Sequence, residues 1–112
     1  MRSLVVQITL LIFIFILSGC AKDKSNMPVK VVSRDSLMGE GLVAQFHNES
    51  PNKIVIHIVL EDKNKANKHS GQLVLEGNSM KEIGWVEGWK FESGDTIKIT
   101  HSDYKPIKYY IP

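Results

Sequence analysis

The stretch Lys53-Ile-Val-Ile-His-Ile-Val-Leu-Glu61 decides the fold class of this chain. From Ile54 to Leu60, every second residue is isoleucine or leucine, while the positions between them carry valine, histidine and valine. Successive side chains of a β-strand point to opposite faces, so this alternation places four large aliphatic groups on one side. The stretch therefore predicts a strand with one face turned toward a hydrophobic core.

The residues just before this stretch alternate in the same way. In the segment 41–48, Leu42, Ala44 and Phe46 alternate with more polar neighbours. Between the two segments lies Glu49-Ser50-Pro51-Asn52, which is rich in residues that favour turns. We therefore expect the two segments to pair as a hairpin, with His47 and His57 close together on its outer face.

Further short strands are expected on both sides of this hairpin. They cover residues 29–33, 72–76, 81–86, 89–91, 96–100 and 107–111, with a polar loop at 62–70. Alternation points Leu73, Leu75, Ile97 and Ile99 inward and predicts that Tyr109 and Tyr110 face opposite sides. With no run of helical period, the sequence predicts an all-β domain, most simply a small antiparallel immunoglobulin-like β-sandwich, with a small barrel as the alternative.

The first twenty residues have a different character. Met1-Arg2-Ser3 is followed by an apolar run from Leu4 to Leu17 and then by Leu17-Ser18-Gly19-Cys20. A run of this length is short for a membrane-spanning helix and fits a signal peptide. The final tetrapeptide resembles the lipobox of bacterial lipoproteins. The resemblance implies that residues 1–19 are removed and that Cys20 carries the lipid; the alternative is an N-terminal anchor helix with an incidental cysteine.

The resemblance also predicts how the chain is placed in a bacterial cell envelope. Residues 20–28, polar and closed by a proline, are expected to form the lipidated cysteine and a flexible tether, with residues 29–112 as the single domain. Ala21 stands where an aspartate would imply retention at the inner membrane, so a lipid anchor in the outer membrane, facing the periplasm, is implied for a Gram-negative source. Cys20 is the only cysteine, which excludes a disulfide within the chain.

The charge balance limits the choice of partner. Without Arg2 the chain keeps thirteen basic and twelve acidic side chains. Such an even balance argues against a nucleic-acid partner.

An aromatic and glycine-rich segment carries the candidate binding residues. Trp85 and Trp89 are flanked by Gly84 and Gly88, which favour a bulge or a tight bend. Tryptophan is enriched at binding hot spots and stacks on sugars and peptides, but a small domain without disulfides also needs large apolar side chains in its core. The glycines favour Trp85 inside and Trp89 nearer the rim, and Tyr110 is a third candidate binding residue.

Signals for catalysis and for a cofactor are missing from the sequence. The chain lacks a Gly-x-Ser-x-Gly nucleophile motif, a His-Glu-x-x-His metal motif and a phosphate-binding glycine loop. His47 and His57 suggest a metal site, but no third ligand stands at a recognised spacing. We therefore expect a protein that is not an enzyme and that has neither a metal nor a cofactor.

Two functions remain open at this stage. The first is a protein-binding or adaptor module held at the membrane, including an inhibitor or immunity protein that blocks an envelope enzyme. It would offer a strand edge or the Trp89 region to an envelope protein partner. The second is a small-ligand or glycan-binding lipoprotein that uses Trp85, Trp89 and Tyr110 as stacking faces. The mature domain itself resembles, in fold only, the immunoglobulin-like modules common on bacterial lipoproteins.

Overall fold

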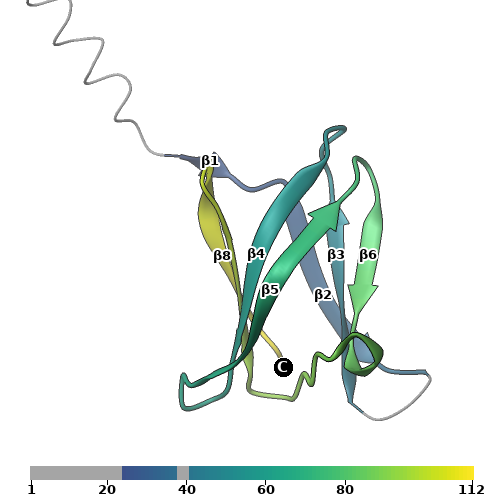
Figure 1. Ribbon diagram of the computed structural model, residues 1–112, viewed down its shortest axis with the longest axis vertical. Helices are drawn as coiled ribbons and strands as arrows, with labels where there is room; N and C mark the ends of the chain where they lie inside the picture. Colours follow the sequence, from purple (N-terminus) through teal and green to yellow (C-terminus); the bar gives the residue numbers. More distant parts are fainter. Residues whose placement is uncertain (1–23, 38–40) are drawn as a thin grey trace, which may run out of the picture.

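The computed structural model describes residues 24–37 and 41–112. Strands dominate these residues, and one short 3-10 helix, η1, lies between β6 and β7 (Figure 1). The elements are β1 (Ser25–Asn26), β2 (Val29–Asp35), β3 (Leu42–Asn48), β4 (Ile54–Glu61), β5 (Asn67–Leu75), β6 (Met80–Ile83), η1 (Trp85–Glu87), β7 (Thr96–His101) and β8 (Tyr104–Tyr110).

The strands form two sheets that pack face to face, which confirms the predicted all-β sandwich. The larger sheet has the order β1-β8-β7-β4-β5, and the smaller has the order β2-β3-β6. Neighbouring strands run antiparallel except β1, which pairs parallel to β8 through Ser25 and Tyr104. The immunoglobulin-like arrangement of the strands stays a prediction.

The core lies between the sheets, and β4 runs through its centre as the alternation predicts. Ile56, Ile58 and Leu60 are fully buried, and their neighbours on β5 and β7 also point inward, as expected for Leu73, Leu75, Ile97 and Ile99. Phe46 and Ala44 of β3 close the core from the other sheet. Burying one such aliphatic side chain contributes about 1.5–3 kcal/mol, so this alternation is the main source of stability.

The predicted hairpin between β3 and β4 is wrong, because the two strands belong to different sheets. β3 pairs with β2 and β6, whereas β4 pairs with β5 and β7. Both strands alternate because each has one face on the core, and a pattern of period two does not say which strand lies alongside. His47 and His57 therefore lie on the outer faces of opposite sheets and are not neighbours.

A buried asparagine lies where the chain crosses between the sheets. The Asn48 side-chain nitrogen donates hydrogen bonds to the carbonyl oxygens of Asn52, Leu75 and Glu76 at 2.8, 3.2 and 3.1 Å. Its side-chain oxygen accepts one from the backbone N–H of Ser50 at 2.9 Å. These bonds connect the end of β3 to the turn before β4 and to the end of β5, and they satisfy a buried polar side chain.

The folded domain begins earlier than the sequence predicts. Within the expected tether of residues 20–28, β1 already pairs with β8, and Met27 is buried in the core. The chain changes sheets between β1 and β2, so this segment seals the core where we expected a free linker. The predicted signal peptide, Cys20 and the first residues of the tether lie outside the described residues. The described part of the chain contains no helix with the length and apolarity needed to cross a membrane.

One other predicted boundary is corrected by local geometry, and the prediction for the two tyrosines of the last strand is confirmed. The polar loop predicted for residues 62–70 is shorter, because β5 begins at Asn67; Asp62 closes the connection by accepting hydrogen bonds from the N–H groups of Asn64 and Ala66 at 2.8 and 3.0 Å. Tyr109 and Tyr110 do face opposite sides: the hydroxyl of Tyr109 lies 2.8 Å from that of Ser33 on β2, while Tyr110 is exposed.

Candidate functional site

The segment expected to be two aromatic strands is instead a hydrogen-bonded turn. The strand β6 ends at Ile83, and η1 follows between Gly84 and Gly88. The carbonyl oxygen of Gly84 accepts hydrogen bonds from the N–H groups of Glu87 and Trp89 at 3.1 and 2.9 Å. The Glu87 carboxylate accepts a hydrogen bond from the N–H of Gly84 at 2.8 Å. These bonds fix the turn on both sides.

Gly88 ends this turn in a conformation that favours glycine. Its φ of 90° lies in the left-handed region, and its N–H donates to the carbonyl oxygen of Trp85 at 3.0 Å. Residues with a Cβ adopt this conformation at a cost of about 1–2 kcal/mol. The chain therefore reverses at Gly88, and the strand that would have put both tryptophans on one face is broken.

The break gives the two tryptophans opposite environments. Trp85 is 61% exposed and its neighbour Val86 is 80% exposed, whereas Trp89 is only 8% exposed. The prediction that Trp85 lies inside and Trp89 nearer the rim is therefore wrong. It assumed a continuous strand with a bulge, and the 3-10 turn rotates Trp85 outward while returning Trp89 to the core.

Trp89 closes one end of the sandwich. Its ring is stacked with Phe91, with centroids 5.8 Å apart, and meets the ring of His69 edge-on at 4.4 Å. A Cβ on Gly71 of β5 would lie 3.6 Å from the Trp89 ring. Trp89 thus covers the inner face of β5 at Gly71 and serves as a structural residue of the core.

An ion pair ties residues 90–95, which follow the turn, to β5. The Lys68 ammonium donates to the carboxylate of Asp95 at 2.7 Å and to the carbonyl oxygen of Lys90 at 2.9 Å. Asp95 is buried and also accepts a hydrogen bond from the N–H of Glu92 at 3.0 Å. Burial by itself would lower the pKa of Lys68, but the hydrogen bond and the charges of Asp95 and Glu92 raise it above the usual lysine value.

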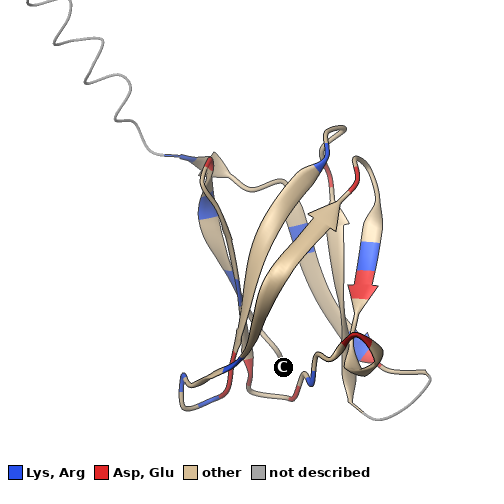
Figure 2. Cartoon of the chain, viewed as in Figure 1, with Lys and Arg blue, Asp and Glu red and all other residues tan. Residues whose placement is uncertain are grey.

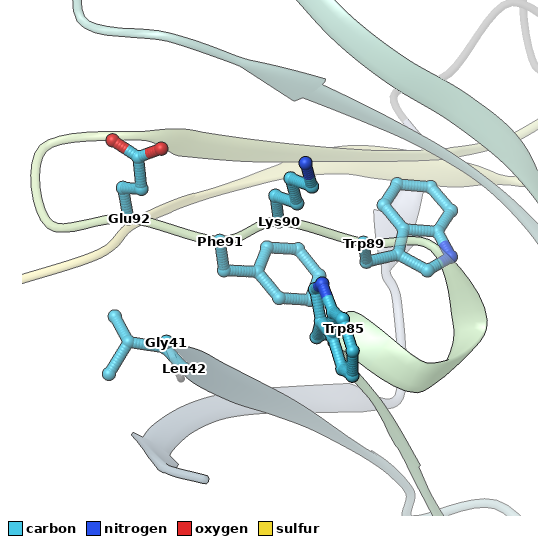
Figure 3. Close-up of a pocket in the computed structure, with 7 residues that line it drawn as sticks. All are labelled: Gly41, Leu42, Trp85, Trp89, Lys90, Phe91 and Glu92. Atoms are coloured by element: carbon cyan, nitrogen blue, oxygen red, sulfur yellow. The ribbon is translucent and has the colours of Figure 1, made fainter. Parts of the chain in front are cut away.

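A groove of about 490 Å³ opens on one side of Trp85 (Figure 3). Trp85 forms part of its wall, and it is also lined by Gly41, Leu42, Trp89, Lys90, Phe91 and Glu92. A single β-bridge between Leu42 and Phe91 holds the two sides of this groove together. Its lining combines aromatic surface with one basic and one acidic side chain.

A second, smaller groove of about 230 Å³ lies on the other side of Trp85 and is lined in part by Leu37, Val86, Arg34 and Glu82. Arg34 and Glu82 form an ion pair here. The hydrogen bond from Arg34, together with one from Gln45, lowers the pKa of the Glu82 carboxyl.

Trp85 therefore stands as a ridge between two grooves, with exposed aliphatic groups beside it. Leu37 is 88% exposed and lines the smaller groove together with Trp85 and Val86. We call Leu37, Trp85 and Val86 the Trp85 patch. Leu37 and Val86 were not predicted as binding residues; the available signal was that both are large apolar residues near the turn-forming residues Ser36 and Gly84.

Tyr110, the third residue predicted for the site, is placed elsewhere. It is 69% exposed, but it lies on β8 of the larger sheet, opposite Thr96, and lines neither groove beside Trp85. The structure thus separates the three predicted aromatics into a buried residue, an exposed residue on the turn and an exposed residue on another face.

The histidines do not form a metal centre in the described part of the chain. His57 and His101 line one shallow depression with Gln72 and Thr100. The Nδ1 atom of His101 accepts a hydrogen bond from the N–H of Asp103 at 3.0 Å. Across residues 24–37 and 41–112, no group of three His, Cys, Asp or Glu side chains is arranged to hold a metal ion.

The edge strands of the two sheets differ in length. β1 has two residues and β6 has four, whereas β2 has seven and β5 has nine. Short edges resist pairing with another chain, and the longer edges of β2 and β5 leave room for strand addition. The Trp85 patch differs from these edges in presenting exposed aromatic and aliphatic side chains together.

Charges do not mark another site. Basic and acidic side chains are interspersed along the described chain, mainly in turns and at strand ends (Figure 2). In the comparisons with known proteins, no family model, no curated protein and no solved structure matches this chain. The geometry of the Trp85 patch is therefore the basis for a function.

Proposed function

We propose that this protein is a bacterial envelope lipoprotein, anchored by lipid on Cys20, whose β-sandwich binds another envelope protein through the Trp85 patch. The lipobox-like sequence Leu17-Ser18-Gly19-Cys20 supports the anchor, and an outer-membrane location facing the periplasm follows from Ala21 for a Gram-negative source. In this proposal the domain acts by binding and catalyses no reaction.

The observation that carries the proposal is an exposed tryptophan on a turn that is already rigid. Trp85 and Val86 contribute little to the core, yet three backbone hydrogen bonds and the Glu87 carboxylate fix the turn that presents them. Truncating a tryptophan at a protein interface commonly costs at least about 2 kcal/mol of binding free energy. A rigid turn also loses less conformational entropy on binding than a mobile loop does.

The surroundings of Trp85 also favour a protein partner. Isolated exposed apolar side chains are common, but Leu37, Trp85 and Val86 line the smaller groove together, and Trp85 also lines the larger one. Contiguous apolar surface with polar residues around it is typical of protein-binding sites. The protruding shape suits an inhibitor or immunity protein, in which one convex element enters a cleft of the partner.

The proposal is tested by crosslinking in intact cells, followed by identification of the captured partners. Two variants are compared with the unchanged protein: Trp85→Ala, and the matched control Tyr110→Ala, which removes an equally exposed aromatic ring from the other sheet. We expect one dominant partner that is lost in Trp85→Ala and kept in Tyr110→Ala. Equal capture by both variants would refute the role of the Trp85 patch.

The anchor is tested separately with Cys20→Ser. We expect this variant to lose metabolic labelling by a fatty acid and to leave the lipid-anchored fraction. Continued labelling of the variant would contradict lipidation at Cys20.

Glycan or small-ligand binding is the second candidate, and the larger groove favours it. This groove combines the aromatic rings of Trp85 and Phe91 with Lys90 and Glu92, which suits stacking and hydrogen bonding to a sugar. The variant Trp89→Phe leaves Trp85 as the only tryptophan, so a fluorescence titration with peptidoglycan fragments reports on this groove. A saturable change in emission would support this candidate, and an unchanged spectrum at millimolar ligand would count against it.

A further inference from the structure

The described chain begins at the end of the sandwich opposite to the Trp85 patch (Figure 1). Ser25 of β1 pairs with Tyr104, beside the turn that joins β7 and β8. The segment after η1, in contrast, leads into Thr96, which pairs with Glu61 at the last position of β4. The start of β1 and the turn that carries Trp85 are therefore separated by about the length of β4, whose eight residues span roughly 26 Å.

The early start of the fold leaves a short connection to the proposed anchor. Because β1 begins at Ser25, only four peptide links separate Cys20 from Lys24, the first described residue. Fully extended, four links reach about 14 Å. This reach is shorter than the length of the sandwich, so the domain cannot invert about its anchor and point the Trp85 end straight at the bilayer to which Cys20 is attached.

We infer that the Trp85 patch is a membrane-distal docking surface, held facing away from the lipid, and that its occupant is an apolar cleft of an envelope protein. This inference rests on the lipid anchor and the binding function proposed above. A tryptophan beside leucine and valine would also suit insertion into a membrane interface, where such side chains are enriched. The position of Lys24 at the opposite end of the domain favours a protein over lipid.

The charged groups around the patch are largely partnered within the domain. The two grooves beside Trp85 are lined by Glu82, Glu87 and Glu92 and by Arg34 and Lys90. Arg34 pairs with Glu82, the carboxylate of Glu92 lies 3.5 Å from the Lys68 ammonium, and the Glu87 carboxylate accepts a hydrogen bond from the N–H of Gly84. We therefore expect the partner's cleft to match the patch mainly through an apolar floor that accepts the Trp85 ring.

The orientation is tested with the full lipidated protein in phosphatidylcholine vesicles that carry bromine atoms on their acyl chains. Bromine quenches tryptophan emission only at short range. The Trp89→Phe variant reports on Trp85 alone. The positive control carries Ala21→Trp together with Trp85→Phe and Trp89→Phe, so that its single tryptophan lies next to the lipidated cysteine in the sequence. Vesicles of the same lipid without bromine give the unquenched emission.

We expect the Ala21→Trp control to be strongly quenched and Trp85 emission to stay within about a tenth of its value in vesicles without bromine. Quenching of Trp85 to the level of the control would show that the patch meets the bilayer and would overturn the inference. Failure of the anchor itself would be visible separately, because Cys20→Ser and the unchanged protein would then associate equally with the vesicles.

A photo-crosslinking side chain at position 85 tests the nature of the occupant in cells, with the same side chain at position 110 as the control. We expect a protein adduct from position 85 that forms at least ten times more strongly than from position 110. Its mapped attachment point should lie in an apolar cleft of that protein. Adducts to lipid at position 85, or an attachment point on a flat charged surface, would contradict the assignment.

Discussion

Trp85 and Trp89 stand four residues apart and differ in almost every structural respect. Trp89 packs against Phe91, His69 and the inner face of β5 at Gly71 and is nearly fully buried, whereas Trp85 projects from a 3-10 turn and lines two grooves. The segment that joins them is held by hydrogen bonds to Gly84 and by the reversal at Gly88. The buried ring anchors the segment, and this anchoring holds the exposed ring in a defined position.

This contrast teaches that residue type alone does not separate a structural aromatic from a binding one. Both side chains are tryptophan, and both are flanked by glycine. Only the path of the backbone decides which ring completes the core. The predictions below treat the two rings as a matched pair and ask whether stability and binding can be changed independently.

The largest expected effect is on stability, from Trp89→Ala. Removing a buried aromatic side chain usually costs about 3–5 kcal/mol of unfolding free energy, so this variant should be severely destabilised. Trp85→Ala should change the unfolding free energy by less than about 0.5 kcal/mol, because the ring is mostly exposed. Urea denaturation followed by circular dichroism measures both values. Similar losses in the two variants would mean that Trp85 also belongs to the core.

The next largest loss of stability is expected from removing the Lys68–Asp95 ion pair, which ties the segment just before β7 to β5. Lys68→Met leaves the carboxylate of Asp95 buried without its charged donor, and we expect a loss of about 2–3 kcal/mol in the same assay. Lys63→Met, in the exposed loop before β5, is the matched control and should have almost no effect. A small loss in Lys68→Met would show that the N–H of Glu92 is a sufficient partner for Asp95.

The ion pair also predicts a change with pH. Because the pKa of Lys68 is raised in the folded state, its stabilising contribution is fully present below the usual lysine pKa. The contribution is lost as the pH rises through the higher pKa of the folded state. The difference in stability between the unchanged protein and Lys68→Met should therefore shrink in strongly alkaline solution.

A smaller effect is expected from Gly88→Ala, which tests the turn without touching either ring. A Cβ at position 88 meets no atom within 4 Å, so only the left-handed backbone conformation opposes the substitution. We expect a loss of about 1 kcal/mol in stability together with weaker partner capture. Gly88→Asn is the matched control, since asparagine tolerates this conformation, and it should lose less on both measures. Equal losses would point to a role for the glycine other than its φ angle.

The smallest effect is expected at the Arg34–Glu82 pair beside the patch. Hydrogen bonds from Arg34 and Gln45 lower the pKa of Glu82, so the pair contributes above the usual glutamate pKa and is lost as the pH falls through the lower value of the folded state. Partner binding should weaken in that acidic range and less so in Glu82→Gln. A titration of binding against pH with both proteins checks this, and identical profiles would exclude a contribution from Glu82.

Much of the fold could be predicted from the alternation of apolar residues. The inward faces of β4, β5 and β7 follow directly from positions such as Ile56, Leu73 and Ile97, because a strand with one buried face has period two. The pairing of strands could not be predicted in the same way. The strands β3 and β4 both alternate and are joined by a short turn, yet they belong to different sheets, and Asn48 forms its side-chain hydrogen bonds where the chain crosses between them.

The candidate site was predicted only in part, for a related reason. The sequence indicated that the segment with Trp85 and Trp89 is unusual, because two glycines interrupt it. It did not indicate a 3-10 turn, which depends on the hydrogen bond that the N–H of Gly84 donates to the Glu87 carboxylate and on the left-handed conformation of Gly88. The assignment of the inner and outer tryptophan was therefore reversed, and the contribution of Leu37 depends on contacts between distant parts of the chain.

The most direct test of the account is the affinity of the captured partner for the purified domain, measured by calorimetry with Trp85→Ala and Tyr110→Ala. The account predicts that Trp85→Ala weakens binding about 30-fold, which corresponds to about 2 kcal/mol, while Tyr110→Ala changes it less than about 2-fold. Equal affinities for the two variants, or a larger loss in Tyr110→Ala, would contradict the claim that the exposed tryptophan of the turn is the binding residue.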